Sequence, residues 1–236
     1  AAAAAAGTAI AAATCACRHV ELSRCGRLAA VCFAGGFAEV LHVPSLARAC
    51  VLQRGRSPPG ACLPGLVKAV FAWHPTGEQR AYDRDVYVVS STSEGKEVVL
   101  YEVYPLGGAH TKATRLAYPL PTVCLAASGE VTDFCVHPSQ QYLVVGAALP
   151  SAATRSVALV FDLWSGQLLS STALFASPLL AGARAAPRPR VLADASGAYL
   201  FCTSGPTLVG PPDELGAAAE EGEGASFATT ACVVCV

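Results

Sequence analysis

Residues 131–146 read Val131-Thr132-Asp133-Phe134-Cys135-Val136-His137-Pro138-Ser139-Gln140-Gln141-Tyr142-Leu143-Val144-Val145-Gly146. Two runs of β-branched and aromatic residues flank a short polar turn that contains proline, a pattern typical of two antiparallel strands. Two further runs follow at similar spacing, over residues 156–161 and 167–174. The segment therefore predicts one four-stranded antiparallel sheet. Its predicted core residues are Phe134, Val136, Leu143, Val145, Val160 and Phe161.

The turn within this stretch has counterparts elsewhere in the chain. They read Leu22-Ser23-Arg24-Cys25-Gly26-Arg27-Leu28, Trp73-His74-Pro75-Thr76-Gly77 and Ala193-Asp194-Ala195-Ser196-Gly197-Ala198-Tyr199-Leu200. Residues 26, 77, 140 and 197 take the same place in the four turns, at steps of 51, 63 and 57 residues. A turn that recurs between apolar runs indicates a repeat architecture, in which each unit buries its apolar face against its neighbours.

Four blade-like units follow from this repeat, over residues 15–55, 66–120, 128–175 and 188–236. The predicted strands are Arg18–Leu22, Arg27–Phe33, Phe37–Val43, Leu46–Leu52, Lys68–Trp73, Val86–Ser91, Glu97–Tyr104, Ala113–Tyr118, Val131–Val136, Tyr142–Ala147, Ser156–Phe161, Gln167–Leu174, Arg190–Ala193, Ala198–Thr203 and Phe227–Val236. This set of about fifteen strands leaves the fourth unit without its last strand. Residues 205–226, rich in glycine and acidic residues, are predicted to be a solvated loop, and no amphipathic helix is predicted.

The third unit, residues 131–174, resembles a WD40 repeat. In that family the first strand ends in a Ser/His-Pro-Asp-Gly turn, and the third strand closes with a Trp-Asp-like pair before a turn that contains glycine. His137-Pro138 and Phe161-Asp162, followed by Gly166, match these features. The second unit matches through Phe71, Trp73, His74-Pro75 and Gly77, whereas Tyr104-Pro105 stands where its closing pair belongs. The other two units match mainly at the turn.

This resemblance implies an all-β protein with a β-propeller fold of the WD40 type. The Gly-His pair that usually precedes the first strand is absent, so the structural Asp–His tetrad of the family is not carried over. About four blades are present. Either the alanine-rich segment 1–14 supplies a closing strand to a four-bladed ring, or the chain is part of a larger propeller, which we favour. In either arrangement Trp73 would be buried between blades, and its replacement by alanine would cost roughly 3–5 kcal/mol.

One rim of a propeller, formed by the start of each first strand and the loop before it, is the usual contact surface of the family. Lys68 takes this position in the second unit, and Glu130 and Thr132 take it in the third. The resemblance therefore predicts that these three residues, or the long loops, contact a protein partner.

Composition argues against several classes of protein. Apolar residues make up 53% of the 236 residues and charged residues 14%, so the chain is not intrinsically disordered. The net charge is −1 and no basic stripe is present, which argues against nucleic acid and anionic membranes as partners. No apolar run reaches the roughly 18 residues of a membrane span. Because the chain has no methionine and no basic leader, a secretory signal is poorly supported, and the chain is expected to be either a processed product or, as we favour, a piece of a longer protein.

The 11 cysteines are interpreted mainly as small buried hydrophobic residues, since most of them lie in apolar runs. Cys232 and Cys235 form a C-x-x-C pair, but no second pair or pair of histidines stands at the spacing of a zinc site. A redox pair normally opens a helix, whereas this pair ends a β-branched run, where the two side chains would face opposite ways. Reduced cysteines favour an intracellular, cytoplasmic protein.

The sequence offers no catalytic motif. The five histidines are scattered, and the recurrence of His74 and His137 at one repeat position indicates a structural role in the turn. Asp133 and Asp162 are interpreted as partners of backbone or histidine groups near a turn, and Trp164 as loop cover. The segment 90–97 lacks the first glycine and the final hydroxyl residue of a phosphate-binding loop. We therefore predict no catalytic, cofactor-binding or metal-binding residues and no small-molecule substrate.

Two classes of function remain. The first is a non-enzymatic scaffold that binds other proteins within a large assembly, for which the family resemblance suggests a cytoskeletal or ciliary complex as one setting. The alternative is a propeller-based hydrolase or other enzyme, which needs carboxylates gathered at one mouth of the channel. The acidic residues are spread thinly along this chain, which favours the scaffold.

Overall fold

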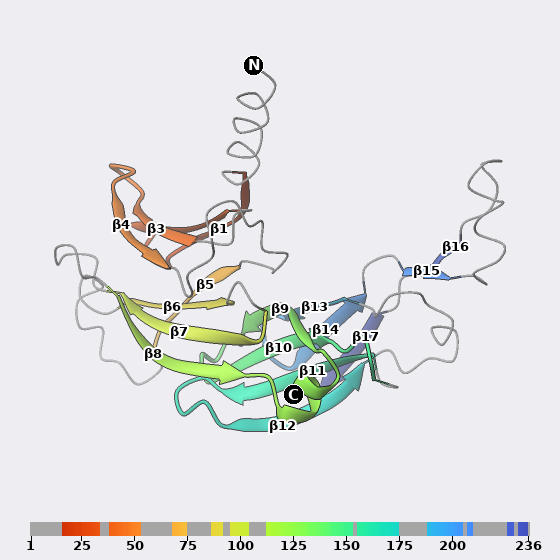
Figure 1. The fold of residues 1–236 in the computed structure, drawn as a ribbon. Helices are drawn as coiled ribbons and strands as arrows, with labels where there is room; N and C mark the ends of the chain where they lie inside the picture. Colours follow the sequence, from red (N-terminus) through yellow and green to blue (C-terminus); the bar gives the residue numbers. More distant parts are fainter. Residues whose placement is uncertain are drawn as a thin grey trace, which may run out of the picture. The chain divides into compact units, whose positions relative to one another are not determined.

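In the computed structural model the described residues form mainly antiparallel β-sheets (Figure 1). The described residues are 16–33, 38–52, 68–74, 86–91, 95–103, 112–152, 155–174, 188–204, 207–209, 226–228 and 231–235. The chain divides into two compact units. The first holds Ala1–Pro119 with the turns Ser139–Gln141 and Leu163–Gln167, and the second holds Leu120–Pro138, Tyr142–Asp162 and Leu168–Val236.

The first unit contains two four-stranded antiparallel sheets, in each of which the strands pair in sequence order. The first sheet consists of β1 (Cys17–Leu22), β2 (Leu28–Phe33), β3 (Ala38–His42) and β4 (Arg48–Leu52). The second consists of β5 (Ala69–Ala72), β6 (Val86–Ser91), β7 (Glu97–Val103) and β8 (Lys112–Pro119). Both sheets have the up-and-down order of a propeller blade.

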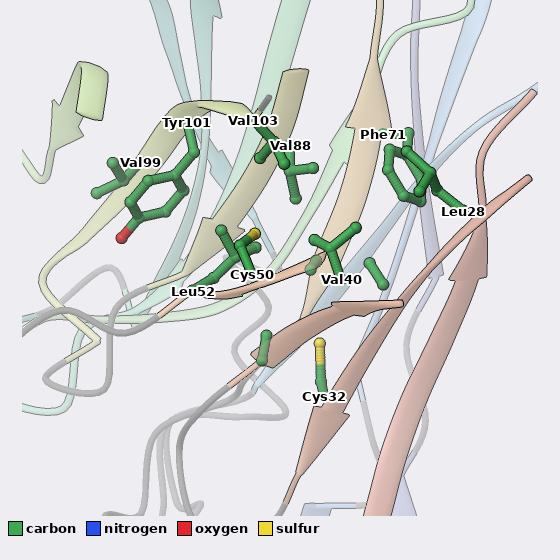
Figure 2. Packing of buried hydrophobic residues seen from close by; sticks show 13 residues of the cluster. Leu28, Cys32, Val40, Cys50, Leu52, Phe71, Val88, Val99, Tyr101 and Val103 are labelled. Carbon is green, nitrogen blue, oxygen red and sulfur yellow. The ribbon is translucent and has the colours of Figure 1, made fainter. Parts of the chain in front are cut away.

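Side chains from these two sheets form one hydrophobic core (Figure 2). Val40, Leu52 and Cys50 of the first sheet meet Phe71, Val88 and Tyr101 of the second. Strand β5 contacts both β1 and β2, so the sheets pack face to face. In β7 the apolar run Val98-Val99-Leu100 is buried without alternation, because side chains on both faces of an inner strand are covered.

The second unit contains the third sheet, made of β9 (Glu130–Val136), β10 (Tyr142–Ala148), β11 (Ser156–Asp162) and β12 (Leu168–Leu174). The prediction for this segment is confirmed: Phe134, Leu143, Val145 and Phe161 are buried and Val136 and Val160 are half-buried, all in one sheet. A second core joins this sheet to the fourth, through Val144, Ala158, Leu174, Val191, Leu200 and Cys202.

The fourth sheet has three strands, β13 (Pro189–Ala193), β14 (Tyr199–Ser204) and β17 (Ala231–Cys235), in that order. The prediction that this unit lacks a fourth strand stays a prediction, because residues 210–225 lie outside the described ones. Two predictions are wrong here. The segment 205–226 is not all loop, because β15 (Thr207–Val209) pairs with β16 (Ser226–Ala228), and the single strand predicted over 227–236 is divided between β16 and β17.

A short helix, α2 (Thr122–Ala126), precedes β9 where the sequence predicted none. It spans five residues and follows Pro121, whose fixed φ of −54° suits the residue before a first helical turn. A helix of a single turn leaves no 3.6-residue apolar pattern in the sequence, so the pattern could not indicate it.

The predicted equivalence of the four turns is confirmed at the three positions that are described. Gly26, Gln140 and Gly197 have φ values of 70°, 60° and 77°, in the left-handed region. Residue 77 lies outside the described residues. The same backbone hydrogen bond closes each of these three turns. It runs from an N–H to the carbonyl five residues later, from Ser23 to Leu28 (2.9 Å), from His137 to Tyr142 (2.9 Å) and from Asp194 to Tyr199 (3.0 Å).

The expectation of an all-β chain is therefore confirmed. The N-terminal segment 1–14 lies outside the described residues, so its role as a closing strand stays a prediction, as do the domain limits. Within the described ranges, no helix is long and apolar enough to cross a membrane.

Candidate protein-interaction surface

Trp73 does not lie in the core, and the prediction that it is buried between blades is wrong. Strand β5 ends one residue earlier, where Ala72 pairs with Tyr87. Phe71 fills the core position with 6% of its surface exposed, whereas Trp73 is 40% exposed. The reason is that pairing stops at Ala72, so Trp73 lies just beyond the end of the strand.

Gln140 holds Trp73 and Trp164 in place. Its side chain is 4% exposed, and its Oε1 atom accepts a hydrogen bond of 3.1 Å from the backbone N–H of Trp73. Its backbone carbonyl accepts a hydrogen bond of 2.7 Å from the indole Nε1 of Trp164. The left-handed backbone at Gln140 therefore serves a structural purpose, because it directs both acceptors toward tryptophans.

Trp164 is the centre of an aromatic cluster. Its ring lies 4.6 Å from the ring of His74, and 5.1 Å from the ring of Tyr87 in an edge-to-face arrangement. Such pairs contribute about 0.5–1.5 kcal/mol beyond the apolar area that they bury. The interpretation of Trp164 as loop cover is consistent with its half-buried position, and His74, which is exposed, contacts it directly.

Two exposed arginines stack on these rings. The Arg24 guanidinium carbon lies 5.4 Å from the centroid of the Trp73 ring. The Arg115 guanidinium lies 5.1 Å from the Tyr87 ring and 5.9 Å from the Trp164 ring, and its Nη1 atom donates a hydrogen bond of 3.2 Å to the Tyr87 hydroxyl. We call this set the aromatic–arginine surface; it consists of Arg24, Trp73, His74, Tyr87, Arg115 and Trp164.

All six residues belong to the first compact unit. Tryptophan, tyrosine and arginine are the residue types enriched at the energetic centres of protein interfaces, because they combine large apolar area with a polar group. The contacts of Arg24 with Trp73, and of Arg115, Tyr87 and His74 with Trp164, restrict these side chains before a partner arrives, which lowers the conformational entropy lost on binding. The arrangement is therefore suited to protein recognition.

The three residues predicted to line the contact rim lie where two strands begin, Lys68 before β5 and Glu130 and Thr132 in the first three residues of β9. Lys68 directly precedes β5 and is half-buried, and its backbone carbonyl accepts a 3.3 Å hydrogen bond from Ser91 N–H. Glu130, also half-buried, forms an ion pair with Arg188. The Thr132 hydroxyl lies 2.7 Å from the Pro189 carbonyl, so it connects β9 to β13. Lys68 lies in the first unit and the other two in the second, and their contact with a partner stays a prediction.

Asp133 and His137 have the structural roles that the sequence suggested. One carboxylate oxygen of Asp133 accepts from Phe134 N–H at 2.9 Å, and the other accepts from Val191 N–H of the neighbouring sheet at 3.0 Å. His137 is 7% exposed and its Nε2 atom lies 2.7 Å from the carbonyl of Gly197. Both residues therefore join the third sheet to the fourth.

The cysteines divide into buried and exposed ones. Burial raises the pKa of Cys32 to about 12, as expected of a core thiol. Cys25 is exposed in the first turn. Partial burial acts to raise the pKa of the Cys25 thiol. Hydrogen bonding outweighs this effect, first of all with the Ser23 hydroxyl 3.4 Å away, so the pKa is lower than that of an ordinary thiol. Among the described residues no group of three or more His, Cys, Asp or Glu could hold a metal ion.

Comparison with known proteins bears on the fold. No known protein family matches the sequence, and no curated protein matches it. Among solved structures, the chain is similar to the β-propeller domain of Cps50 (Swd1) from Myceliophteria thermophila, with a TM-score of 0.52 and 15% identity. The match covers 84% of this chain and 53% of that one, so this chain spans about half the length of that propeller.

The computationally designed Ika4 protein also resembles the chain, with a TM-score of 0.47 and 14% identity over 94% of this chain and 92% of that one. The likeness to the Swd1 domain, together with the sheets of consecutive antiparallel strands, confirms the predicted β-propeller fold class.

Proposed function

We propose that this chain is a non-catalytic, WD40-type scaffold that binds other proteins through the aromatic–arginine surface, as part of a larger assembly. The observation that carries the proposal is the exposure of Trp73, whose ring lies under the Arg24 guanidinium and outside both hydrophobic cores. The WD40 assignment rests on the turn and closing residues of the third sheet, His137-Pro138 and Phe161-Asp162. An intracellular location, in a cytoskeletal or ciliary setting, belongs to the same proposal.

The alternative function, a propeller-based enzyme, needs carboxylates directed at a substrate. Several described carboxylates have structural partners instead. Glu39 pairs with Arg48 at 3.2 Å, Glu102 with Arg115 at 3.8 Å, and Asp133 accepts two backbone N–H groups. These partners favour the scaffold.

Site-specific photo-crosslinking in the native cells tests the proposal. A photoreactive amino acid placed at Ser165, which is exposed and adjoins Trp164, should give a discrete crosslinked protein, and the product should be lost when Trp73→Ala is added. The same group at Ser171, an equally exposed serine on the edge strand β12, is the matched control. Crosslinks from Ser171 but not Ser165 would rule out the surface, and a photoreactive group at Glu130 tests the predicted rim residues of the second unit.

A further inference from the structure

We propose that the aromatic–arginine surface recognises an acidic peptide segment of its partner, in which carboxylates flank an apolar side chain. This inference rests on the proposed function and adds the chemistry of the partner. It follows from the geometry of the two arginines, the charge balance of the surface and the exposed area of Trp73.

Arg24 is prepared to bind a carboxylate. Its guanidinium stacks on the Trp73 ring, and a stacked guanidinium still presents its N–H donors at its edge, in the fork geometry that matches a carboxylate. Within the described part of the chain, no carboxylate lies within ion-pair distance of Arg24, and the side chain is exposed. A carboxylate supplied by a partner would therefore gain a charge-assisted, bidentate contact.

The positive charge of Arg115 is partly neutralised by an acidic neighbour, so the two arginines differ in the charge that they offer to a partner. Its guanidinium lies 3.8 Å from the carboxylate of Glu102, whose side chain is 21% exposed. Counting histidine as neutral, the charged groups that the structure describes in these contacts, two arginines and one glutamate, sum to +1. Since the excess charge belongs to Arg24, the partner's carboxylate is expected beside Trp73.

Trp73 supplies the apolar part of the contact. Its backbone is fixed by the hydrogen bond to buried Gln140, and 40% of its surface remains open. Burying the rest of an indole ring removes apolar area from water at about 25 cal/mol per Å². An aliphatic side chain next to the partner's carboxylates would cover this ring while the carboxylates reach Arg24.

Single-stranded nucleic acid is the other ligand that uses arginines and aromatic rings. It requires a positively charged groove that follows the phosphate backbone over several nucleotides. Only two arginines stand on this surface and one of them has an acidic partner, so the described residues favour a peptide.

Tryptophan fluorescence measures this binding directly, because the chain has 2 tryptophans and both belong to the surface. The full chain is titrated with a five-residue peptide in which leucine has two glutamates on each side. Matched titrations use the same peptide with glutamines and a uridine oligonucleotide. The expected result is a saturable change in emission for the glutamate peptide, with affinity about tenfold higher than for the glutamine peptide, which corresponds to about 1.4 kcal/mol.

Two variants locate the contact. Arg24→Gln should weaken binding of the glutamate peptide about tenfold. Arg18→Gln, an exposed arginine at the other end of the same sheet, should leave the affinity unchanged. Circular dichroism confirms that both variants are folded, as expected for exposed side chains. Equal affinity for the two peptides, no effect of Arg24→Gln, or tighter binding of the oligonucleotide would each overturn the proposal.

The crosslinking experiment separates this inference from the proposed function. If the product at Ser165 depends on Trp73 but survives both Arg24→Gln and high salt, the surface binds proteins and acidic recognition is wrong. If no product depends on Trp73, the proposed function itself fails. If the Ser165 product is lost with Arg24→Gln but kept with Arg18→Gln, the result supports both the proposed function and recognition of an acidic segment.

Discussion

We expect removal of the Asp133 carboxylate to destabilise the second compact unit. The loss should be larger than for any other charged side chain that the structure describes in that unit. The side chain is 4% exposed, in strand β9. It accepts hydrogen bonds from the backbone N–H of Phe134 and, across to the fourth sheet, from Val191. In Asp133→Ala these two donors lose their acceptor in a place that water does not reach.

The magnitude follows from those two bonds. A buried donor left without a partner costs about 1–3 kcal/mol, so two of them, with the small cavity left behind, give about 3–5 kcal/mol. Asp133→Asn keeps one acceptor oxygen but turns an NH₂ group toward the second donor, so we expect a loss of about 2 kcal/mol. Glu130→Gln is the matched control. It removes a carboxylate from the same strand, but one in a half-exposed ion pair with Arg188, where the loss is at most about 1 kcal/mol.

Urea unfolding followed by far-ultraviolet circular dichroism measures these differences. Tryptophan fluorescence adds a second probe that reports on the first unit, because Trp73 and Trp164 both belong to it. If the two units unfold separately, Asp133→Ala shifts the dichroism transition and leaves the fluorescence transition in place. A change in the free energy of unfolding below about 0.5 kcal/mol, or one no larger than that of Glu130→Gln, would refute the reasoning.

Three further outcomes are expected. Trp73→Ala should lower the free energy of unfolding by about 1–2 kcal/mol, against about 3–5 for Phe71→Ala, and equal losses in urea titrations would contradict the exposed position of Trp73. Gly197→Ala should lower the melting temperature more than Gly26→Ala. Both glycines have positive φ, but a Cβ at 197 would lie 2.6 Å from a histidine nitrogen whereas one at 26 meets nothing within 4 Å. Cys25, with its lowered pKa, should be alkylated first among the described cysteines, with a rate that rises with pH through a midpoint below that of an ordinary thiol; peptide mapping checks the order.

The sequence was a good guide to the strands because each blade repeats a local pattern. Strand β6 occupies the predicted residues, and β10 and β11 end within one residue of the prediction. Continuous apolar runs with β-branched residues are enough to identify buried inner strands. Strand β15, which was missed, and β16, which was predicted only as part of a longer strand, have three residues each and lie next to glycine-rich and acidic segments, where composition favours a loop.

The candidate surface could not be predicted in the same way, since its contacts join residues that are distant in sequence. The hydrogen bond from Trp73 to Gln140 spans 67 positions, and the ring contact of His74 with Trp164 connects turns of different sheets. The only local sign is that each tryptophan directly follows the end of an apolar run, close to a turn residue. For Trp73 this position was interpreted as the last core residue of a strand, because large aromatic rings are usually buried, whereas Trp164 was interpreted as loop cover.

The position of Trp73 also bears on why it is a tryptophan. A turn residue with 40% of its surface open contributes less to the core than Phe71 two positions earlier, and Gln140 binds its backbone N–H, which any residue except proline would offer. Folding therefore requires little of the indole ring itself. The ring is nevertheless covered on one side by Arg24, and the backbone N–H of Trp73 is bound by the same Gln140 whose carbonyl accepts from the Trp164 indole. An exposed indole has a cost in solubility, so the proposed protein contact would give this ring a role that the stability of the blade does not require.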